Sequence, residues 1–411
     1  MNNYSDSLKQ KYPWDRGFDL DDLAELTHRL HHPKLYRGKF KTKAGENKIP
    51  VPFANPRVPY KSIGNNFKFI DLFAGIGGFR LAGEQVSGIC VFSSEWDKYA
   101  RRAYFMNFGQ VPYGDITQFT KSTADLNRIP EHDVLCAGFP CQAFSISGKQ
   151  GGFKDPRGTL FFEIYKIAKH HKPKVLFLEN VKNFAKHDKG NTFRTVKYTL
   201  EEKMAQETNG EVFYRVSSAV LNASDFGAST KRERIYIVAV RNDLSENFLL
   251  WEDWCNIFKD LGRNNIPPKF LENDIQGDDA IDPLLLKKIT IRRGDIKLSK
   301  KNHVYHPNPI RIGIIGKGGQ GERIYSIKGH AITFSAYGGG AASKTGAYLI
   351  NNKVRKLTPT ECARAMGFRK MDVNTIDVPL IQRYKQFGNS VVVDVVREIF
   401  KHIESRWLRQ G

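Results

Sequence analysis

Short apolar runs alternate with helix-like segments between residues 67 and 240, and this alternation limits the possible folds more than any other feature of the chain. The apolar runs lie at 67–73, 88–93, 133–137, 175–178 and 234–240. Between most of them, apolar residues recur at the spacing of an amphipathic helix. Strands that alternate with helices predict a parallel or mostly parallel sheet that is covered on both faces. We therefore expect an α/β fold.

The segment before this pattern differs from it in composition. Residues 1–65 form an N-terminal extension that is basic and contains several prolines. Asp19 can cap a short helix in this extension, because leucines follow it at helical spacing. These leucines are Leu20, Leu23, Leu26 and Leu30. Two interpretations of the extension stay open: an arm that contacts DNA phosphates, or a solvated tail with one docked helix.

The alternating pattern ends near residue 259, so we place the first domain at 66–259. Residues 260–358 contain basic clusters and many glycines but no long helical period, which predicts a second, smaller domain of strands and loops. Helical spacing returns within residues 359–411, and we expect this last segment to rejoin the first domain.

The chain is strongly basic. It has 64 Lys and Arg against 43 Asp and Glu, which gives a formal net charge of +21. This charge predicts a polyanionic partner, with nucleic acid favoured over a membrane because no basic amphipathic helix stands out. No apolar run approaches the roughly 18 residues that a membrane span requires, and the N-terminus lacks a signal-peptide pattern. The five cysteines form no CxxC pair, so we expect a cytoplasmic protein with reduced thiols and without structural zinc.

A glycine-rich turn joins the first predicted strand to the first helix. Glu95 lies 20 residues after Gly75, the distance at which an acidic residue takes a ribose hydroxyl in nucleotide-binding sheets. The glycine spacing is GxGG rather than GxGxxG, which favours a nucleoside without phosphates, such as S-adenosylmethionine. In that site Glu95 would hold the ribose, Trp96 would lie against the adenine and Asp115 would take its amino group. An NAD-type site or a merely structural turn stays open as an alternative.

A second strand end carries a cysteine. Gly138 and Pro140 stop the apolar run 133–137 abruptly, so Cys141 is predicted in a tight turn at the carboxyl end of a strand. Open α/β sheets bind their ligands at this edge, and a thiol there is a nucleophile if its pKa is lowered. The glycine-rich, basic segment that follows is expected to form a mobile lid. Taken alone, a cysteine such as Cys141 is more often a buried structural residue than a nucleophile.

Two more motifs are predicted at the same edge. Glu179 ends the run 175–178, where burial would raise the pKa of its carboxyl group. Arg232 and Arg234 open the late strand, where a guanidinium can bind a carbonyl or a phosphate. Either motif alone could form a surface salt bridge. Together, a thiolate, a carboxylic acid and a cation are what methylation of an unreactive pyrimidine carbon requires.

The motifs occur in a fixed order. They lie at 71–78, 140–141, 179–181, 232–234, 357–368 and 386–391. This ordered set resembles that of the DNA cytosine-5 methyltransferases, and the similarity extends over residues 67–411. It implies a Rossmann-like S-adenosylmethionine-dependent methyltransferase sheet, a DNA-recognition domain at 260–358, and a hinge and return at 359–411. Within the family, residues 316–325 and 335–340 resemble recognition segments of bacterial enzymes that methylate the first cytosine of GCGC.

The resemblance also implies roles for individual residues. Cys141 would attack carbon 6 of a flipped-out cytosine, Glu179 would protonate or hydrogen-bond ring nitrogen 3, and Arg234 would hold the ring oxygen, with Arg232 beside it. The implied cofactor contacts are Asp71, Phe73, Gly75, Ile76, Gly77, Gly78, Glu95, Trp96, Asp115, Ile116, Pro140, Asn389, Ser390 and Val391. The implied DNA contacts are Ser147, Arg311, Lys317, Gly319, Gln320, Arg323, Ser335, Tyr337, Gly338, Gly339 and Gly340. Of these, Ser147 and Gln320 would fill the gap in the duplex.

The expected substrate is double-stranded DNA that contains GCGC, with or without specified flanking bases. A partner restriction endonuclease would share this site without forming a stable complex, although an orphan regulatory enzyme would have the same sequence features. We expect a monomer. The rival substrate is RNA, but the RNA branch of the family has a threonine shortly after the catalytic cysteine, where this chain has Phe144 and Ser145. An inactive DNA-binding relative would have lost Cys141 or Glu179.

Overall fold

The computed structural model describes residues 19–31, 67–140, 160–247, 289–291, 308–351, 353–368 and 378–408. Within these residues the larger sheet has the strand order β2-β1-β3-β4-β6-β5. Its strands are β1 (Lys68–Leu72), β2 (Ile89–Ser94), β3 (Val134–Gly138), β4 (Val175–Val181), β5 (Tyr214–Asn222) and β6 (Glu233–Arg241). The first four are mutually parallel, whereas β6 runs antiparallel to both β4 and β5. The expectation of a mostly parallel α/β sheet is confirmed, although the sequence analysis had not identified β5.

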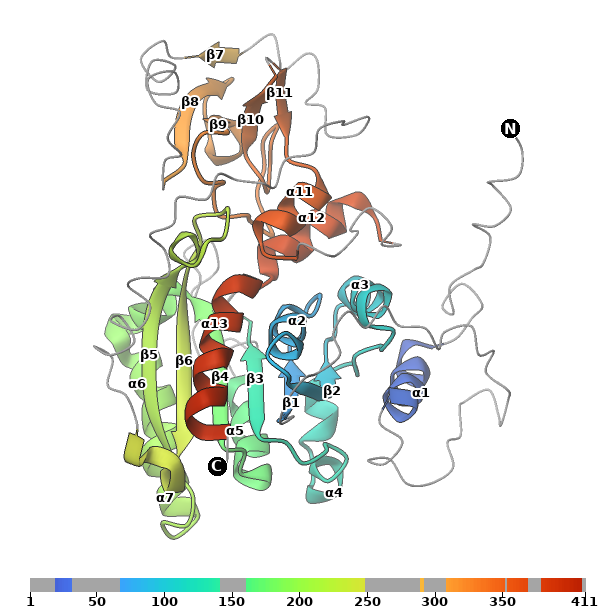
Figure 1. Cartoon of the computed structure of the whole chain (residues 1–411), viewed down its shortest axis with the longest axis vertical. Coiled ribbons are helices and arrows are strands. Elements are labelled where there is room, and N and C mark those ends of the chain that lie inside the picture. Colours follow the sequence, from blue (N-terminus) through green and yellow to red (C-terminus); the bar gives the residue numbers. More distant parts are fainter. Residues whose placement is uncertain are drawn as a thin grey trace.

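Helices cover both faces of this sheet (Figure 1). Helices α2 (Gly78–Glu84) and α13 (Val393–Ile403) pack on one face, with α3 (Lys98–Phe108) beside them. Helices α5 (Leu160–His171), α6 (Asn191–Tyr198) and α7 (Met204–Glu207) pack on the other, and α4 (Thr123–Leu126) is a short turn. Successive strand residues serve opposite faces: Phe69 packs in the first core and Ile70 in the second.

The last helix, α13, packs directly on the middle of the larger sheet. The ring centroid of Phe400 lies 5.6 Å from that of Phe69 on β1 and 5.2 Å from that of Phe177 on β4. Residues from the far end of the chain therefore complete the core that the first strands begin.

The reversed direction of β6 determines where its first residues lie. Val181 at the carboxyl end of β4 pairs with Arg234 near the start of β6, and Glu179 pairs with Tyr236. Glu179 also pairs with Gly138 at the end of β3. The ends of β3 and β4 and the beginning of β6 thus meet at one edge of the sheet.

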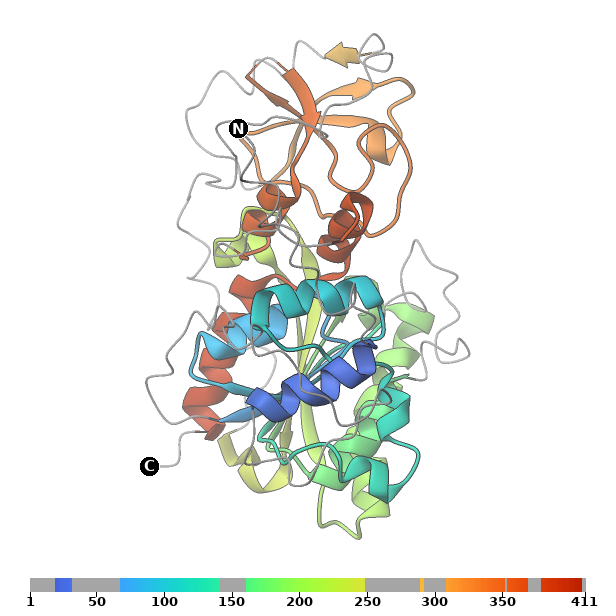
Figure 2. The same ribbon diagram turned by 90° about the vertical axis from the view of Figure 1, so that its right-hand side faces the viewer.

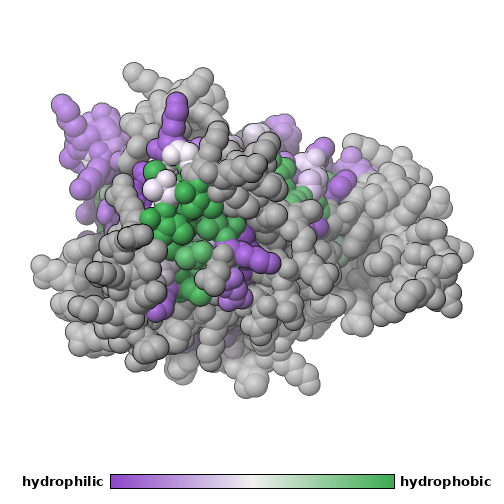
Figure 3. All heavy atoms as spheres, turned by 90° about the horizontal axis from the view of Figure 1, so that it is seen from above, coloured by the Kyte–Doolittle hydropathy of each residue, from purple (hydrophilic) through white to green (hydrophobic). Residues whose placement is uncertain are grey.

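A second, smaller sheet lies beyond that edge (Figure 1). It has the order β11-β10-β9-β8-β7 and consists of β7 (Ile289–Ile291), β8 (Ile310–Ile315), β9 (Arg323–Ser326), β10 (Ala347–Ile350) and β11 (Lys353–Lys356). Its separate core is small and contains Ile312, Ile315, Ile324, Ala342 and Ala347. Seen from above, apolar side chains gather in one patch, with hydrophilic side chains at parts of its border (Figure 3).

Helices α11 (Pro359–Ala365) and α12 (Leu380–Asn389) lie between the two sheets (Figure 1). Thr358 begins α11 with a capping box, because its hydroxyl accepts from the Glu361 N–H while the Glu361 carboxylate accepts from the Thr358 N–H. Near the end of α12, a Cβ added to Gly388 would lie 2.1 Å from the backbone nitrogen of Ala336. Only glycine allows this close approach between α12 and the loop of the smaller domain.

Helix α1 (Leu20–His31) lies beside β2, at the outer edge of the larger sheet (Figure 2). Asp19 precedes it and accepts from the backbone N–H of Asp21, as the predicted cap requires. The basic and proline-containing remainder of residues 1–65 lies outside the described residues. In the part of the chain that the structure describes, no helix is long and apolar enough to cross a membrane.

Candidate active site

The turn between β1 and α2 leaves open space at one of its glycines and is closely packed at the next two. Gly75 and Gly77 have φ values of +55° and +85°, which favour glycine. A Cβ at Gly77 would lie 2.2 Å from the ring of Phe108, and one at Gly78 would lie 2.5 Å from Cγ2 of Val391. A Cβ at Gly75 would meet nothing within 4 Å. Gly77 and Gly78 therefore permit packing, and Gly75 borders space that a ligand can occupy.

Glu95 lies next to this space, immediately after β2. One carboxylate oxygen accepts from the Gly75 N–H and the other from the Asp97 N–H, each at 2.8 Å. Burial raises the pKa of Glu95, and the two backbone amides partly oppose this rise. The carboxylate keeps further acceptor positions that suit the two hydroxyls of a ribose. The indole of Trp96 is 78% exposed and can lie against a flat base. These residues fit a nucleoside cofactor.

The predicted cofactor residues fall into two groups by exposure. The partly or fully exposed ones are Phe73, Gly75, Trp96, Asp115, Pro140 and Asn389. The buried ones are Asp71, Ile76, Gly77, Gly78, Glu95, Ile116, Ser390 and Val391. Asp115 caps a short 3-10 helix, Ile116–Phe119, by accepting from the Thr117 N–H at 2.9 Å.

Asp71 is the most deeply buried of the predicted acidic cofactor residues, and its assignment as a cofactor contact stays a prediction. It is 0% exposed, and neither carboxylate oxygen has a hydrogen-bond partner of standard geometry among the described residues. Burial raises the pKa of Asp71 well above its ordinary value, while the backbone amide and guanidinium of Arg80 lower it in part. The motif that contains Asp71 covers the end of β1 and the turn after it, and the Asp71 side chain itself is fully buried.

Glu179 and Arg234 form a buried ion pair at the meeting point of β4 and β6. Oε1 of Glu179 lies 3.2 Å from Nε of Arg234, with side-chain exposures of 10% and 14%. Burial raises the pKa of Glu179, and the guanidinium groups of Arg234 and Arg232 partly oppose the rise. A carboxyl group with a raised pKa next to a fixed cation can protonate or hydrogen-bond one position of a ligand while the cation binds another.

The strand end before Cys141 lies beside this pair. A Cβ added to Gly138 would be 3.7 Å from Oε2 of Glu179. Asn180, which is fully buried, donates from Nδ2 to the carbonyl oxygen of Phe139 at 3.3 Å and so holds the backbone just before Pro140. Sequence reasoning had missed Asn180, although its place after Glu179 at a strand end was a signal. Cys141 and Ser147 lie outside the described residues.

Arg232 immediately precedes β6, at the predicted start of the late strand. Its guanidinium is buried and donates to three backbone carbonyls, those of Phe334 at 3.2 Å, Gly388 at 2.9 Å and Ser390 at 2.8 Å. These hydrogen bonds tie the start of β6 to a loop of the smaller domain and to the end of α12. These three contacts of its guanidinium are all with backbone carbonyls, and a contact between Arg232 and a reacting base stays a prediction.

The two predicted recognition segments meet in the part of the chain that forms the smaller sheet. A Cβ at Gly321 would lie 2.1 Å from the carbonyl oxygen of Gly339, and the Ala342 N–H donates to the Gly321 carbonyl at 2.8 Å. Tyr337 is 56% exposed, and the hydroxyl of Ser335 bonds its backbone.

The other predicted DNA contacts lie on or near the same surface. Among them, the exposed residues are Lys317, Gly319, Gly338, Gly339 and Gly340, and the half-buried residues are Arg311 and Arg323. Arg311 lies within β8 and pairs with Tyr325, and Arg323 begins β9. The side chain of Gln320 lies outside the described residues.

Comparison with known proteins gives consistent results. The model of the C-5 cytosine-specific DNA methylase family matches residues 67–405. Type II methyltransferase M.HhaI of Haemophilus parahaemolyticus is 50% identical over 340 residues, which cover 82% of this chain and 94% of that protein. Type II methyltransferase M.HpaII of Haemophilus parainfluenzae is 40% identical over 366 residues, which cover 88% and 94%.

A solved structure shares the fold at low sequence identity. The S. pombe Dnmt2 methyltransferase matches with a TM-score of 0.57 at 17% identity, over 82% of this chain and 98% of that one. In the described parts of the chain, no group of three or more His, Cys, Asp or Glu is placed to hold a metal ion.

Proposed function

Since this chain belongs to the C-5 cytosine-specific DNA methylase family, we propose that it methylates the first cytosine of GCGC, alone or within a longer site, in double-stranded DNA. It is a Type II DNA (cytosine-5-)-methyltransferase of the restriction-modification type and uses S-adenosylmethionine. The GCGC assignment is supported by residues 316–325 and 335–340, which resemble recognition segments of GCGC-specific enzymes.

The observation that carries the mechanism is the buried pair of Glu179 and Arg234 beside the end of β3. The target cytosine leaves the duplex, because its ring cannot be reached within the stack. The Cys141 thiolate adds to carbon 6 while Glu179 protonates or hydrogen-bonds ring nitrogen 3 and Arg234 holds the ring oxygen. The cofactor supplies the methyl group to carbon 5. Loss of the proton on carbon 5 then restores the double bond and expels the thiolate.

The raised pKa of Glu179 suits this role. A carboxyl group with a raised pKa holds a proton more readily and can donate it to ring nitrogen 3, which withdraws electrons from carbon 6 as the thiolate attacks. Arg234 stays charged throughout and stabilises negative charge on the ring oxygen. Their ion pair holds both groups in the orientation that the base needs.

The smaller domain is proposed to read the sequence. Arginine contacts from Arg311 and Arg323 to guanine edges would give direct readout, with Ser335, Tyr337 and the glycines at 338–340 allowing close approach. Ser147 and Gln320 fill the space that the flipped cytosine leaves. Lys317 and other lysines supply affinity for phosphates that decreases with salt.

The test measures transfer of labelled methyl from S-adenosylmethionine to duplexes that contain GCGC. We expect transfer to GCGC duplexes with any one of several flanks, and none when the first cytosine is replaced by thymine. Methyl transfer is also measured to matched duplexes that contain CCGG, which test a different DNA site, and to a transfer RNA, which tests an RNA substrate. Transfer to the RNA alone would assign the chain to the RNA branch, and the absence of transfer to every GCGC duplex would refute the proposed site.

Two expectations about partners need separate measurements. We expect the purified chain to be a monomer by light scattering. If an endonuclease partner exists, we expect it to be blocked by methylation of the same site and to elute separately from this chain.

A further inference from the structure

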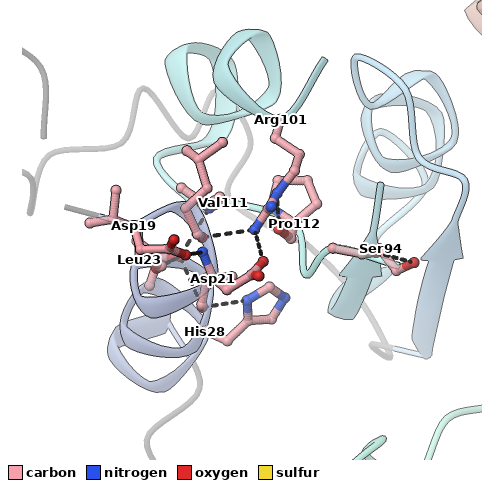
Figure 4. A network of polar contacts seen from close by, with 12 residues as sticks. Asp19, Asp21, Leu23, His28, Ser94, Arg101, Val111 and Pro112 are labelled. Atoms are coloured by element: carbon pink, nitrogen blue, oxygen red, sulfur yellow. Dashed lines mark hydrogen bonds and ion pairs between the residues drawn. The ribbon is translucent and has the colours of Figure 1, made fainter. Parts of the chain in front are cut away.

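Helix α1 lies outside the residues that the family model matches, yet it docks beside the carboxyl end of β2, where Glu95 follows (Figure 4). We propose that α1 is a positioning element for the S-adenosylmethionine pocket. It holds residues 111–113, and through them Glu95 and Asp115, in place for the ribose and the adenine. This inference rests on the proposed function, because it takes these two carboxylates as cofactor contacts.

Residues 111–113 form the outer wall of β2 at this point. The Tyr113 N–H donates to the carbonyl of Ser93 at 2.8 Å, and the Glu95 N–H donates to the carbonyl of Tyr113 at 2.7 Å. The backbone position of Glu95 is therefore set by Tyr113. Asp115 follows Tyr113 by two residues on the same wall. Whatever fixes this wall also fixes the two carboxylates.

Two consecutive residues of α1 bond the backbone of this region. The Thr27 hydroxyl donates to the Leu23 carbonyl at 2.8 Å and accepts from the Val111 N–H at 2.9 Å. His28 is 0% exposed, and its Nε2 accepts from the Ser93 N–H at 3.3 Å. Since Val111 is also fully buried, its N–H has no access to water if Thr27 loses its hydroxyl.

Side chains of the wall and of α1 also contact each other. The imidazole of His28 stacks on the ring of Tyr113 with a centroid distance of 4.3 Å. The Tyr113 hydroxyl donates to the Glu25 carboxylate at 2.7 Å. Tyr113 is thereby held by α1 at its ring and at its hydroxyl, in addition to its backbone bonds with β2.

Arg101 on α3 joins α1 to the same wall (Figure 4). Its Nε donates to the Pro112 carbonyl at 2.9 Å, while Nη2 donates to the Leu20 carbonyl at 2.8 Å and to the Asp21 carboxylate at 2.7 Å. The Arg101 side chain is 7% exposed. Three consecutive residues of the wall, 111–113, thus each have a polar contact that α1 makes or shares.

The apolar contacts of α1 show that it is docked rather than merely adjacent. Leu23 and Ala24 are 3% and 0% exposed and belong to the core on one face of the larger sheet. The rest of that core comes mainly from the strands and from α5, α6 and α7, together with residues of α3 and of the segment 111–119. Loss of one hydrogen bond from α1 should therefore make residues 111–113 less rigidly held, while most of the core of the larger sheet stays packed.

The test uses a matched pair of full-length variants. Thr27→Val keeps the shape of the side chain and loses the acceptor for the Val111 N–H, whereas Thr27→Ser keeps the hydroxyl. Calorimetry without DNA measures the Kd for S-adenosylmethionine, and steady-state kinetics measure the KM for each substrate. We expect Thr27→Val to raise the Kd and the KM for the cofactor about tenfold, with the KM for DNA unchanged and Thr27→Ser close to wild type.

The outcomes separate this inference from the proposed function. A wild-type chain that does not bind S-adenosylmethionine contradicts the proposed function itself. If the wild type binds it and Thr27→Val binds within twofold of it, α1 does not position the pocket. Equal losses for cofactor and DNA with a lower Tm would show a merely structural helix and also overturn the inference. Should Thr27→Val not fold, Tyr113→Phe, which removes only the bond to Glu25, is expected to raise the cofactor Kd about threefold, and an unchanged Kd would refute the proposal.

Discussion

The two sheets hold their functional residues in different ways. At the edge of the larger sheet, Glu179 is 7% exposed and paired with Arg234, and Glu95 accepts from two backbone amides. In the smaller domain, Tyr337 is 56% exposed on a glycine-rich loop above a small core. Groups that react must be fixed to within fractions of an ångström, whereas groups that read DNA can adapt to it. We infer that chemistry depends on the larger sheet and sequence choice on the smaller one.

The two regions are nevertheless joined at residues 388–390, part of the segment that we propose completes the cofactor pocket. Arg232 binds carbonyls of residues 334, 388 and 390, and so connects the recognition loop with the end of α12. Nearby, Lys385 on α12 pairs with Asp97 at 2.9 Å, two residues after Glu95. Substitutions at this junction should therefore affect both cofactor binding and DNA binding. Substitutions within one region alone should affect only the function of that region.

The largest effect is expected for Glu179→Gln. The amide cannot deliver a proton to the ring, so kcat should decrease about 10²-fold to 10⁴-fold while the Kd for S-adenosylmethionine and the preference for GCGC stay unchanged. Single-turnover kinetics on several duplexes measure all three. Glu202→Gln, at an exposed position, is the control and should behave as wild type. If Glu179→Gln changed the sequence preference more than kcat, the inferred division of function between the two sheets would be wrong.

Arg232→Ala should affect both regions at once. Three carbonyls lose a buried charged donor, which lowers the free energy of unfolding by about 2–4 kcal/mol and raises the KM for both cofactor and DNA. Denaturant unfolding and steady-state kinetics measure these effects. Arg215→Ala replaces an exposed arginine of the same sheet and should change neither quantity. A loss confined to kcat would instead support a direct catalytic role for Arg232.

The pH dependence of kcat should reflect the titration of the Glu179 carboxyl group. Because burial raises its pKa, its protonated form is present at low pH and is lost as the pH rises through the raised pKa, so kcat should decrease in that direction. Above this pKa the decrease should be about tenfold per pH unit. A pH profile of single-turnover rates shows this descending limb, which Glu179→Gln should abolish. A limb that persists in the variant would assign it to another group.

A smaller effect is expected for Lys317→Ala in the smaller domain. Loss of one phosphate contact should raise the KM for DNA several-fold, reduce the slope of log K against log salt by about one, and leave kcat unchanged. Binding titrations at several salt concentrations measure the slope. Lys197→Ala, on α6 of the larger domain, is the control and should keep the wild-type slope. An equal change in both variants would place DNA binding elsewhere than on the smaller sheet.

The difference between the sheets also explains what the sequence could predict. Strand ends are marked by apolar runs that stop at Gly, Pro or a charged residue, so the turn at Gly75 and the positions of Glu95 and Glu179 could be predicted from local pattern. The structural role of Arg232 could not, because its partners come from residues 334, 388 and 390. Local pattern likewise did not show that Asp71 is fully buried.

Two other features depended on tertiary context. The leucine spacing predicted the short helix at Leu20–His31 but could not tell which surface it covers. Strand β5 was missed because polar residues (Arg215, Ser217 and Ser218) interrupt the apolar run by which the other strands were identified. The assignments of Cys141 and Ser147 stay predictions, as do those of the DNA-reading residues.

The most direct test of the chemistry at the larger sheet traps its covalent step. A GCGC duplex that carries 5-fluorocytosine as the first cytosine, incubated with S-adenosylmethionine, cannot lose a proton from carbon 5, so the thiolate cannot be expelled. Mass spectrometry of the digested complex identifies the residue attached to DNA. We predict a methylated adduct on Cys141 that Cys141→Ser does not form. An adduct on another residue, or none in an enzyme that methylates the ordinary duplex, would contradict the account.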